Sequence, residues 1–84
     1  MADRAAQIRL RIRELLVGLF TDAGFLSGVP DSVSLRQAGV SSNALVSLLV
    51  EMEDAFGFQW DDDVRPEVLR SIDSLADHVL ALAA

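Results

Sequence analysis

The spacing of the apolar residues restricts the fold of this chain more than any other feature. From about Asp3 to Thr21 they recur at intervals of three and four, the period of an amphipathic helix. Residues 8–13 also alternate between apolar and polar, as in a strand, but the longer count and the absence of proline favour a helix, with Leu10 as the misfit. Arg9 and Arg13 lie one turn apart on its polar side, where we expect them to be solvated. The apolar stripe consists of Ile8, Ile12, Leu15, Leu16, Leu19 and Phe20.

A second helix is predicted to begin at Ser41-Ser42, because serine suits the cap that accepts hydrogen bonds from the first helical turn. It extends for about 15 residues to Gly57, a residue type that often ends helices. Val46 and Val50 lie one turn apart and away from the main apolar face, as suits contact with a partner. That main face consists of Leu45, Leu48, Leu49, Met52 and Phe56.

The segment between these helices, from Asp22 to Ser41, is rich in glycine, serine and aspartate and also contains a proline, a composition typical of a loop. A connection this long is uncommon in a compact domain unless it packs on the core. Five apolar residues allow that packing, so we expect an ordered loop and not a domain boundary. They are Phe25, Leu26, Val29, Val33 and Leu35.

Two further helices are predicted near the end of the chain. Pro66 followed by Glu67 suits the first turn of a short helix, and Ser71 can cap a final one. No alternating segment remains to build a sheet. We therefore predict an all-α fold, a small four-helix bundle with three main helices, one short helix and a long ordered first loop, in a single domain over residues 1–84. The inner face of the final helix consists of Ile72, Leu75, Val79 and Leu80.

Composition excludes several classes of protein. The 84 residues contain no cysteine, so there are no disulfides or thiolate metal sites, and packing must stabilise a small core. The 13 acidic residues outnumber seven arginines, there is no lysine, and the net charge of −6 argues against a nucleic-acid partner. No apolar run reaches the roughly 18 residues of a membrane span, and the N-terminus lacks a secretory signal. We expect a cytoplasmic monomer that binds neither nucleic acid nor membrane.

The acidic residues are concentrated in the second half of the chain. Residues 1–42 contain five arginines and four acidic residues, whereas residues 43–84 contain two arginines and nine acidic residues. This asymmetry suits a basic partner. A solvated face that only keeps the protein soluble is the alternative.

Neither a metal site nor an enzyme active site is predicted. Asp61, Asp62 and Asp63 are consecutive, so their side chains diverge, and the ligand spacing of a calcium loop is absent. His78 is the only histidine, and we expect it on the surface of the last helix. No Gly-x-Ser-x-Gly motif or paired acid and base is present. The chain is therefore not expected to be an enzyme.

The segment from Gly39 to Asn43 carries the one candidate site. A serine at a helix start exposes its hydroxyl at the positive end of the helix dipole, where a phosphate ester is stabilised. On position alone, a serine there is a helix cap.

The surrounding pattern resembles the acyl carrier protein and peptidyl carrier protein family over nearly the whole chain. Gly39-Val40-Ser41-Ser42 corresponds to the family's Gly-x-Asp-Ser, leucines follow along the helix, and Phe56-Gly57 begins 14 positions after Ser42. The resemblance implies that Ser42 carries a covalent 4′-phosphopantetheine whose thiol holds an acyl or aminoacyl group as a thioester. The implied partners are a phosphopantetheinyl transferase, an adenylating enzyme or acyltransferase, and synthase modules.

Two departures from the family pattern indicate a specialised carrier. Ser41 replaces the aspartate before the modified serine, and Asn43 replaces the leucine or methionine after it. The first two turns of this helix also lack the acidic residues of fatty-acid carriers. The resemblance therefore points to polyketide or nonribosomal natural-product biosynthesis. The partner-binding surface predicted on this helix consists of Ser41, Asn43, Val46, Ser47, Val50 and Asp54.

A second hypothesis remains open on the sequence. The chain would then be a small helical protein-interaction module, or a degenerate carrier, in which Ser42 is only a helix cap. Val46 and Val50 would bind the protein partner.

Overall fold

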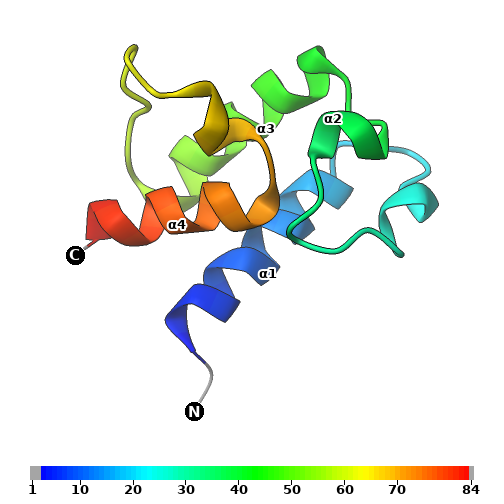
Figure 1. Cartoon of the computed structure of the whole chain (residues 1–84), viewed down its shortest axis with the longest axis horizontal. Helices are drawn as coiled ribbons and strands as arrows, with labels where there is room; N and C mark the ends of the chain where they lie inside the picture. The colour runs from blue at the N-terminus through cyan, green and yellow to red at the C-terminus, as the bar shows by residue number, and fades with distance from the viewer. Residues whose placement is uncertain (1–2, 84) are drawn as a thin grey trace.

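The computed structural model describes residues 3–83, and within them every regular element is a helix (Figure 1). The predicted all-α bundle is confirmed. Three long helices surround the core, and shorter helical turns lie in the two long connections. In chain order the elements are α1 (Arg4–Val17), η1 (Gly24–Leu26), α2 (Leu35–Ala38), α3 (Ser42–Phe56), η2 (Pro66–Leu69) and α4 (Ile72–Ala83), where η marks a 3-10 helix.

Helix α1 buries the predicted stripe and is shorter than predicted. Asp3 caps it, with its Oδ1 atom accepting a hydrogen bond from the N–H of Ala5 at 3.3 Å. Leu10, the residue that did not fit the stripe, is 60% exposed. The helix ends at Val17 instead of near Thr21. The N–H of Gly18 still bonds back four residues to Glu14, but those of Leu19 and Phe20 bond back only three residues, as in turns.

The core lies where α1 packs against α3 and α4. Each helix contributes residues spaced by three or four positions, as the sequence predicted. The connections add residues from η1, from α2 and from the turn before α3, so the long first loop is ordered against the core. The buried apolar residues are Ile8, Ile12, Leu16, Leu26, Leu35, Val40, Leu48, Met52, Ile72, Leu75, Ala76 and Val79.

The first loop contains two helical turns that the sequence pattern did not reveal, η1 and α2. They have three and four residues, too few for an apolar repeat to be recognised. Helix α2 is bounded by Ser34, whose Oγ accepts a hydrogen bond from the N–H of Gln37, and by Gly39.

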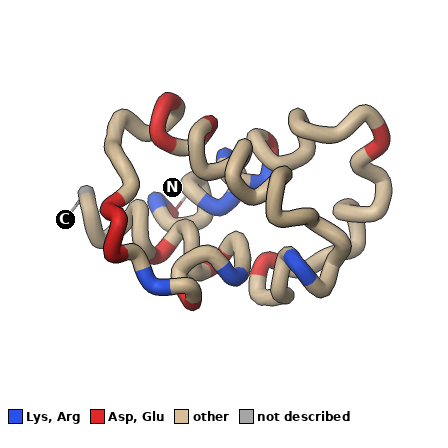
Figure 2. Tube along the Cα trace, turned by 90° about the horizontal axis from the view of Figure 1, so that it is seen from above, with Lys and Arg blue, Asp and Glu red and all other residues tan. Residues whose placement is uncertain are grey.

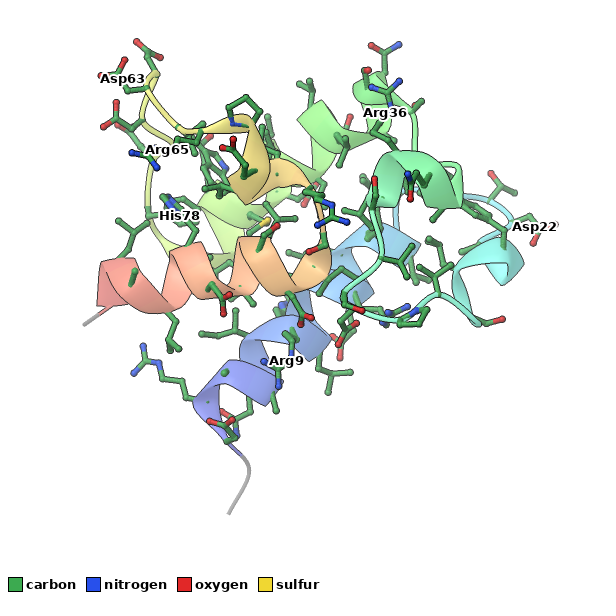
Figure 3. All side chains as sticks on the ribbon, viewed as in Figure 1. Arg9, Asp22, Arg36, Asp63, Arg65 and His78 are labelled. Carbon is green, nitrogen blue, oxygen red and sulfur yellow. The ribbon has the colours of Figure 1, made fainter. Side chains whose placement is uncertain are left out.

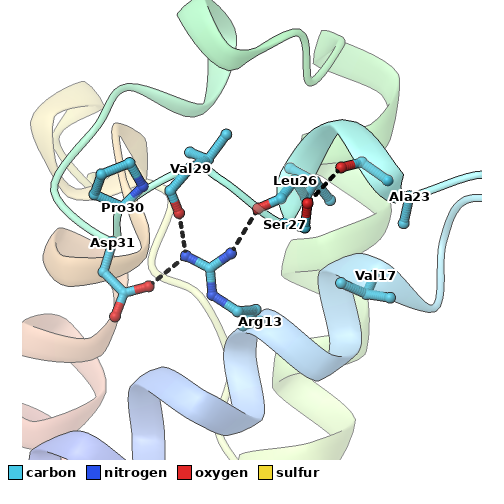
Figure 4. A pocket seen from close by; sticks show the side chains of 9 residues that line it. Arg13, Val17, Ala23, Leu26, Ser27, Val29, Pro30 and Asp31 are labelled. Atoms are coloured by element: carbon cyan, nitrogen blue, oxygen red, sulfur yellow. Dashed lines mark hydrogen bonds and ion pairs between the residues drawn. The ribbon is translucent and has the colours of Figure 1, made fainter.

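The prediction that Arg13 is solvated is wrong. Its guanidinium donates hydrogen bonds to the carbonyl oxygens of Leu26 (3.0 Å) and Val29 (2.6 Å) and to Oδ1 of Asp31 (2.6 Å), across a shallow pocket between α1 and the loop (Figure 4). Arg9 also lies within 4.0 Å of Asp31. The three partners of Arg13 lie 13 to 18 residues away along the chain, too far to be found from the helical period. The polar side of α1 therefore holds the first loop in place.

The second loop is tied to both α3 and α4. The indole Nε1 of Trp60 donates to the carbonyl oxygen of Leu49 at 3.0 Å, and the ring stacks on His78 of α4 at a centroid distance of 5.0 Å. His78 is therefore half-buried under the loop instead of fully on the surface. The short helix predicted at Pro66 is present as η2. Within residues 3–83, no helix has the length and apolar character needed to span a membrane.

Candidate functional site

The turn between α2 and α3 packs against the core and is hydrogen-bonded to α2. Gly39 has a φ of 109°, a left-handed conformation that strains any residue with a side chain. The ring of Phe25 lies 3.7 Å from the position that a Cβ of Gly39 would take. The next residue, Val40, is 1% exposed, and its N–H donates to the carbonyl oxygen of Leu35 at 2.9 Å. The start of α3 is therefore held against the core.

Ser41, and not Ser42, is the cap of α3. The Oγ atom of Ser41 accepts a hydrogen bond from the N–H of Ala44 at 3.2 Å, and its carbonyl oxygen accepts one from Leu45 at 3.0 Å. The hypothesis that Ser42 is the helix cap is therefore wrong. Ser42 is the first residue of the helix and is exposed, so its hydroxyl is not needed to satisfy the helix end.

The hydroxyl of Ser42 is hydrogen-bonded to an arginine side chain of α2. Nη1 of Arg36 donates a hydrogen bond to Ser42 Oγ at 2.5 Å, and Figure 3 shows the Arg36 side chain at the edge of the molecule where α2 adjoins α3. Within residues 3–83, the first-turn N–H groups of Ser42 and Asn43 have no protein acceptor. Exposed amides and a guanidinium both favour an anion at this position.

Sequence reasoning missed Arg36. It lies six residues before Ser42 on a four-residue helix, and the contact depends on the turn at Gly39. The only hint in the sequence was an arginine a few residues before a candidate phosphate site. Because α2 was not predicted, nothing indicated that this side chain points towards Ser42.

The predicted partner-binding residues lie together on the outer side of α3. Ser41, Asn43, Ser47 and Asp54 are exposed. Val46 and Val50 are 60% and 59% exposed, which is high for valine in a small domain. Together these residues form a strip along α3 that begins beside Ser42 and runs to the acidic end of the helix.

The acidic end of this strip borders a shallow hollow lined by Val50, Glu51, Glu53, Asp54, Phe58 and Gln59. Glu53 is engaged internally, because its Oε2 accepts a hydrogen bond from the N–H of Trp60 at 2.9 Å. Glu51 and Asp54 are exposed. In Figure 2 the acidic positions are spread along the trace, and the longest stretch is the exposed run Asp61 to Asp63. The acidity after Ser42 is therefore divided among the end of α3, the loop that follows and the later helices.

No cluster of three or more histidine, aspartate or glutamate side chains that could hold a metal ion is present among residues 3–83. Asp61, Asp62 and Asp63 are exposed, and the Oδ1 atom of Asp61 accepts a hydrogen bond from the N–H of Asp63. This contact is that of a local turn.

Comparison with known proteins relates the chain to one kind of synthase. No protein-family model and no solved structure matches it. Over 59 residues, it is 36% identical to the non-reducing polyketide synthase pks12 of Talaromyces marneffei, and a second sequence of that name from the same organism matches equally. The matched part is 68% of this chain and 3% of the synthase. The chain is thus similar to a small part of a polyketide synthase.

Proposed function

We propose that this chain is a carrier protein in polyketide or nonribosomal natural-product biosynthesis. Ser42 is the attachment point of 4′-phosphopantetheine, and the chain presents an acyl or aminoacyl group to partner enzymes. The main support is that Ser42 is exposed at the start of α3 while Ser41, the residue before it, caps the helix. The resemblance of the surrounding pattern to carrier proteins and the similarity to part of a polyketide synthase support it.

The start of α3 fits a phosphodiester on Ser42. The group would bring one negative charge to the end of the helix where the N–H groups of Ser42 and Asn43 have no acceptor within the described part of the chain, residues 3–83. Arg36 adds a permanent positive charge within hydrogen-bond distance of Oγ. When bound, the group supplies a thiol that this cysteine-free chain lacks and that can hold an acyl group as a thioester.

Attachment uses coenzyme A and a phosphopantetheinyl transferase. Ser42 Oγ attacks the phosphorus next to the pantetheine, a new O–P bond forms, and the bridging P–O bond breaks. 3′,5′-ADP leaves, and the serine proton passes to a base of the transferase. The carrier's part is to present an accessible hydroxyl on a rigid turn, which its anchored backbone at Gly39 and Val40 allows. The chain itself is not an enzyme in this proposal.

The strip along α3 is the proposed contact for the transferase, for the adenylating enzyme or acyltransferase that loads the arm, and for synthase modules. Its centre is apolar at Val46 and Val50, and its far end is acidic at Asp54. A partner with an apolar contact and a basic rim would complement it. The first two turns of α3 carry no acidic residue, which distinguishes this surface from that of fatty-acid carriers.

Intact-mass spectrometry tests the proposal. The wild-type chain is incubated with coenzyme A and a transferase of broad specificity, and we expect a gain of one phosphopantetheinyl group. Ser42→Ala should gain nothing, whereas Ser41→Ala, the matched control one residue away, should still be modified. A wild-type chain that stays unmodified, or a gain that persists in Ser42→Ala, would refute the carrier function.

The exposed pair Val46 and Val50 favours a second candidate function, a helical module that binds a protein partner without any modification. In that case the wild-type chain would show no gain in mass. Substitution at Val46 would nevertheless weaken binding of the partner.

A further inference from the structure

The backbone of Arg36 is held in place by neighbouring residues that pack on the core. Its neighbour Leu35 is 1% exposed, and the N–H of Leu35 donates to the carbonyl oxygen of Arg70 at 2.8 Å. Ser34 and Gly39 bound the short helix on either side. The backbone of Arg36 is therefore fixed relative to α3, and its side chain reaches Ser42 from a defined direction.

Among residues 3–83, no carboxylate forms an ion pair with Arg36. The ion pairs among residues 3–83 involve Arg9, Arg11 and Arg13, which bind acidic groups of α1, the first loop and α4. Arg36 instead donates to a neutral hydroxyl. In a chain with a net charge of −6, an exposed arginine without an acidic partner leaves its charge available to an anion.

We propose that Arg36 is a positioning residue for the phosphate on Ser42, an inference that rests on the proposed carrier function. After modification, Oγ becomes an ester oxygen and a poorer acceptor, while the negative charge lies on the non-bridging oxygens of the same phosphorus. The guanidinium then moves from Oγ to these oxygens. Its planar fork of donors suits two oxygens on one phosphorus better than it suits a single hydroxyl.

Arg36 also assists the attachment step without transferring a proton. A guanidinium stays protonated at any relevant pH, so it cannot take the proton of Ser42. By donating to Oγ, it leaves the hydroxyl proton free for the base of the transferase. Its charge stabilises the phosphate of coenzyme A as it approaches Oγ.

Kinetics of attachment give the first test. For Arg36→Ala we expect kcat/KM for modification by the transferase to fall about fivefold, the size typical of one exposed charge-assisted hydrogen bond. Arg36→Lys, which keeps the charge and loses the fork, should recover part of the rate. Arg4→Ala removes the same charge at the start of α1, on the opposite side of the molecule from α2 (Figure 1), and should behave as wild type.

Spectroscopy of the isolated modified protein separates a contact with the phosphate from a contact with the transferase. All variants are modified to completion with excess transferase. The 31P resonance of modified Arg36→Ala should differ from that of wild type and of Arg4→Ala. High salt should move the wild-type resonance towards the variant's, because salt screens an exposed pair. The Nε–H resonance of Arg36 in wild type should also shift on modification.

The outcomes distinguish this inference from the function on which it rests. If the wild-type chain gains no mass, the proposed function fails and the role of Arg36 fails with it. The wild-type chain could be modified while its 31P resonance equals that of modified Arg36→Ala and its Arg36 Nε–H resonance stays the same after modification. In that case Arg36 does not bind the phosphate, whatever the rate at which Arg36→Ala is modified. An unchanged rate in Arg36→Ala would refute its part in attachment.

Discussion

Serines stand at the start of both α3 and α4, but the two helix starts differ in what is left exposed. At α4, Ser71 is 5% exposed, its Oγ accepts from the N–H of Ser74, and its own N–H donates to Ser74 Oγ. The hydroxyl of Ser74 in turn donates to the carbonyl oxygen of Val68 at 2.7 Å. At α3, Ser41 makes one capping bond, and Ser42 is exposed beside Arg36.

The difference shows how a hydroxyl at a helix start can stay exposed to solvent. The start of α4 lies under η2 and against the first loop, where the N–H of Asp73 donates to the carbonyl oxygen of Asp31 at 3.0 Å. Every hydroxyl there serves folding. At α3, the cap hydrogen bond is accepted by Ser41, the residue before the helix, and the exposed hydroxyl of Ser42 instead accepts from Arg36. Substitutions at the two helix starts separate the folding role of serine from the proposed modification role.

Removing a hydroxyl at the closed helix start should destabilise the protein most. Ser74→Ala leaves the N–H of Ser71 and the carbonyl oxygen of Val68 without these partners in a part-buried site. We expect a loss of about 1–3 kcal/mol in the free energy of unfolding, measured by urea denaturation followed by circular dichroism. Ser42→Ala, the matched change at the open start, should alter it by less than about 0.5 kcal/mol. Equal losses would mean that the two starts do not differ in this way.

Removing the cap of α3 should have an intermediate effect. Ser41→Ala deletes the acceptor for the N–H of Ala44, and we expect a loss of about 1 kcal/mol in the free energy of unfolding. The modification of Ser42 should persist, because its hydroxyl is independent of the cap. If Ser41→Ala were as stable as wild type, Ser42 would have to take over the cap, and the rate of modification should then fall.

A charge on the exposed strip should affect partners and leave the fold intact. For Val46→Asp we expect a change of less than about 0.5 kcal/mol in the free energy of unfolding, since the residue is 60% exposed. The rate of modification of Ser42 by the transferase should fall about fivefold, because an apolar contact is replaced by a solvated charge.

Leu10→Asp provides the control for that substitution. Leu10 has the same 60% exposure on α1, so the same charge is introduced away from α3. Its rate of modification should match that of wild type. Equal slowing in both variants would show that total charge matters and the strip does not, and unfolding of Val46→Asp would show that Val46 supports the core.

Much of the fold was predictable because the signals are local. Helix α3 begins and ends where the sequence predicted, since Ser41 and Gly57 act on the amides and carbonyls within one turn of themselves. Exposure of Val46 and Val50 followed from the same helical period. Helix α1 is shorter than predicted because the last apolar residues of the stripe, Leu19 and Phe20, lie in a turn after the helix and pack on the core from there. The spacing of those residues alone does not show whether they belong to a loop turn or to one more turn of the helix.

The residues of the candidate site were named in part from the sequence, and their role stays a prediction. Ser42 and the strip along α3 followed from a motif and a helical period, both readable within 15 residues. Arg36 did not, and neither did the binding of Arg13 to the first loop. In both cases the partners are on different elements, so the contact exists only after the intervening turn has been folded.

The sequence by itself determined an all-α chain, the faces of its long helices and the serine that begins α3, because helical period and caps depend on neighbours a few residues apart. Only the tertiary structure decided which serine hydroxyl is exposed and which is buried in hydrogen bonds that support the fold. That outcome depends on burial: η2 and the first loop cover the start of α4, whereas the start of α3 stays open to solvent with Arg36 beside it. Burial is a property of the packed chain, since it depends on segments that lie far apart in the sequence.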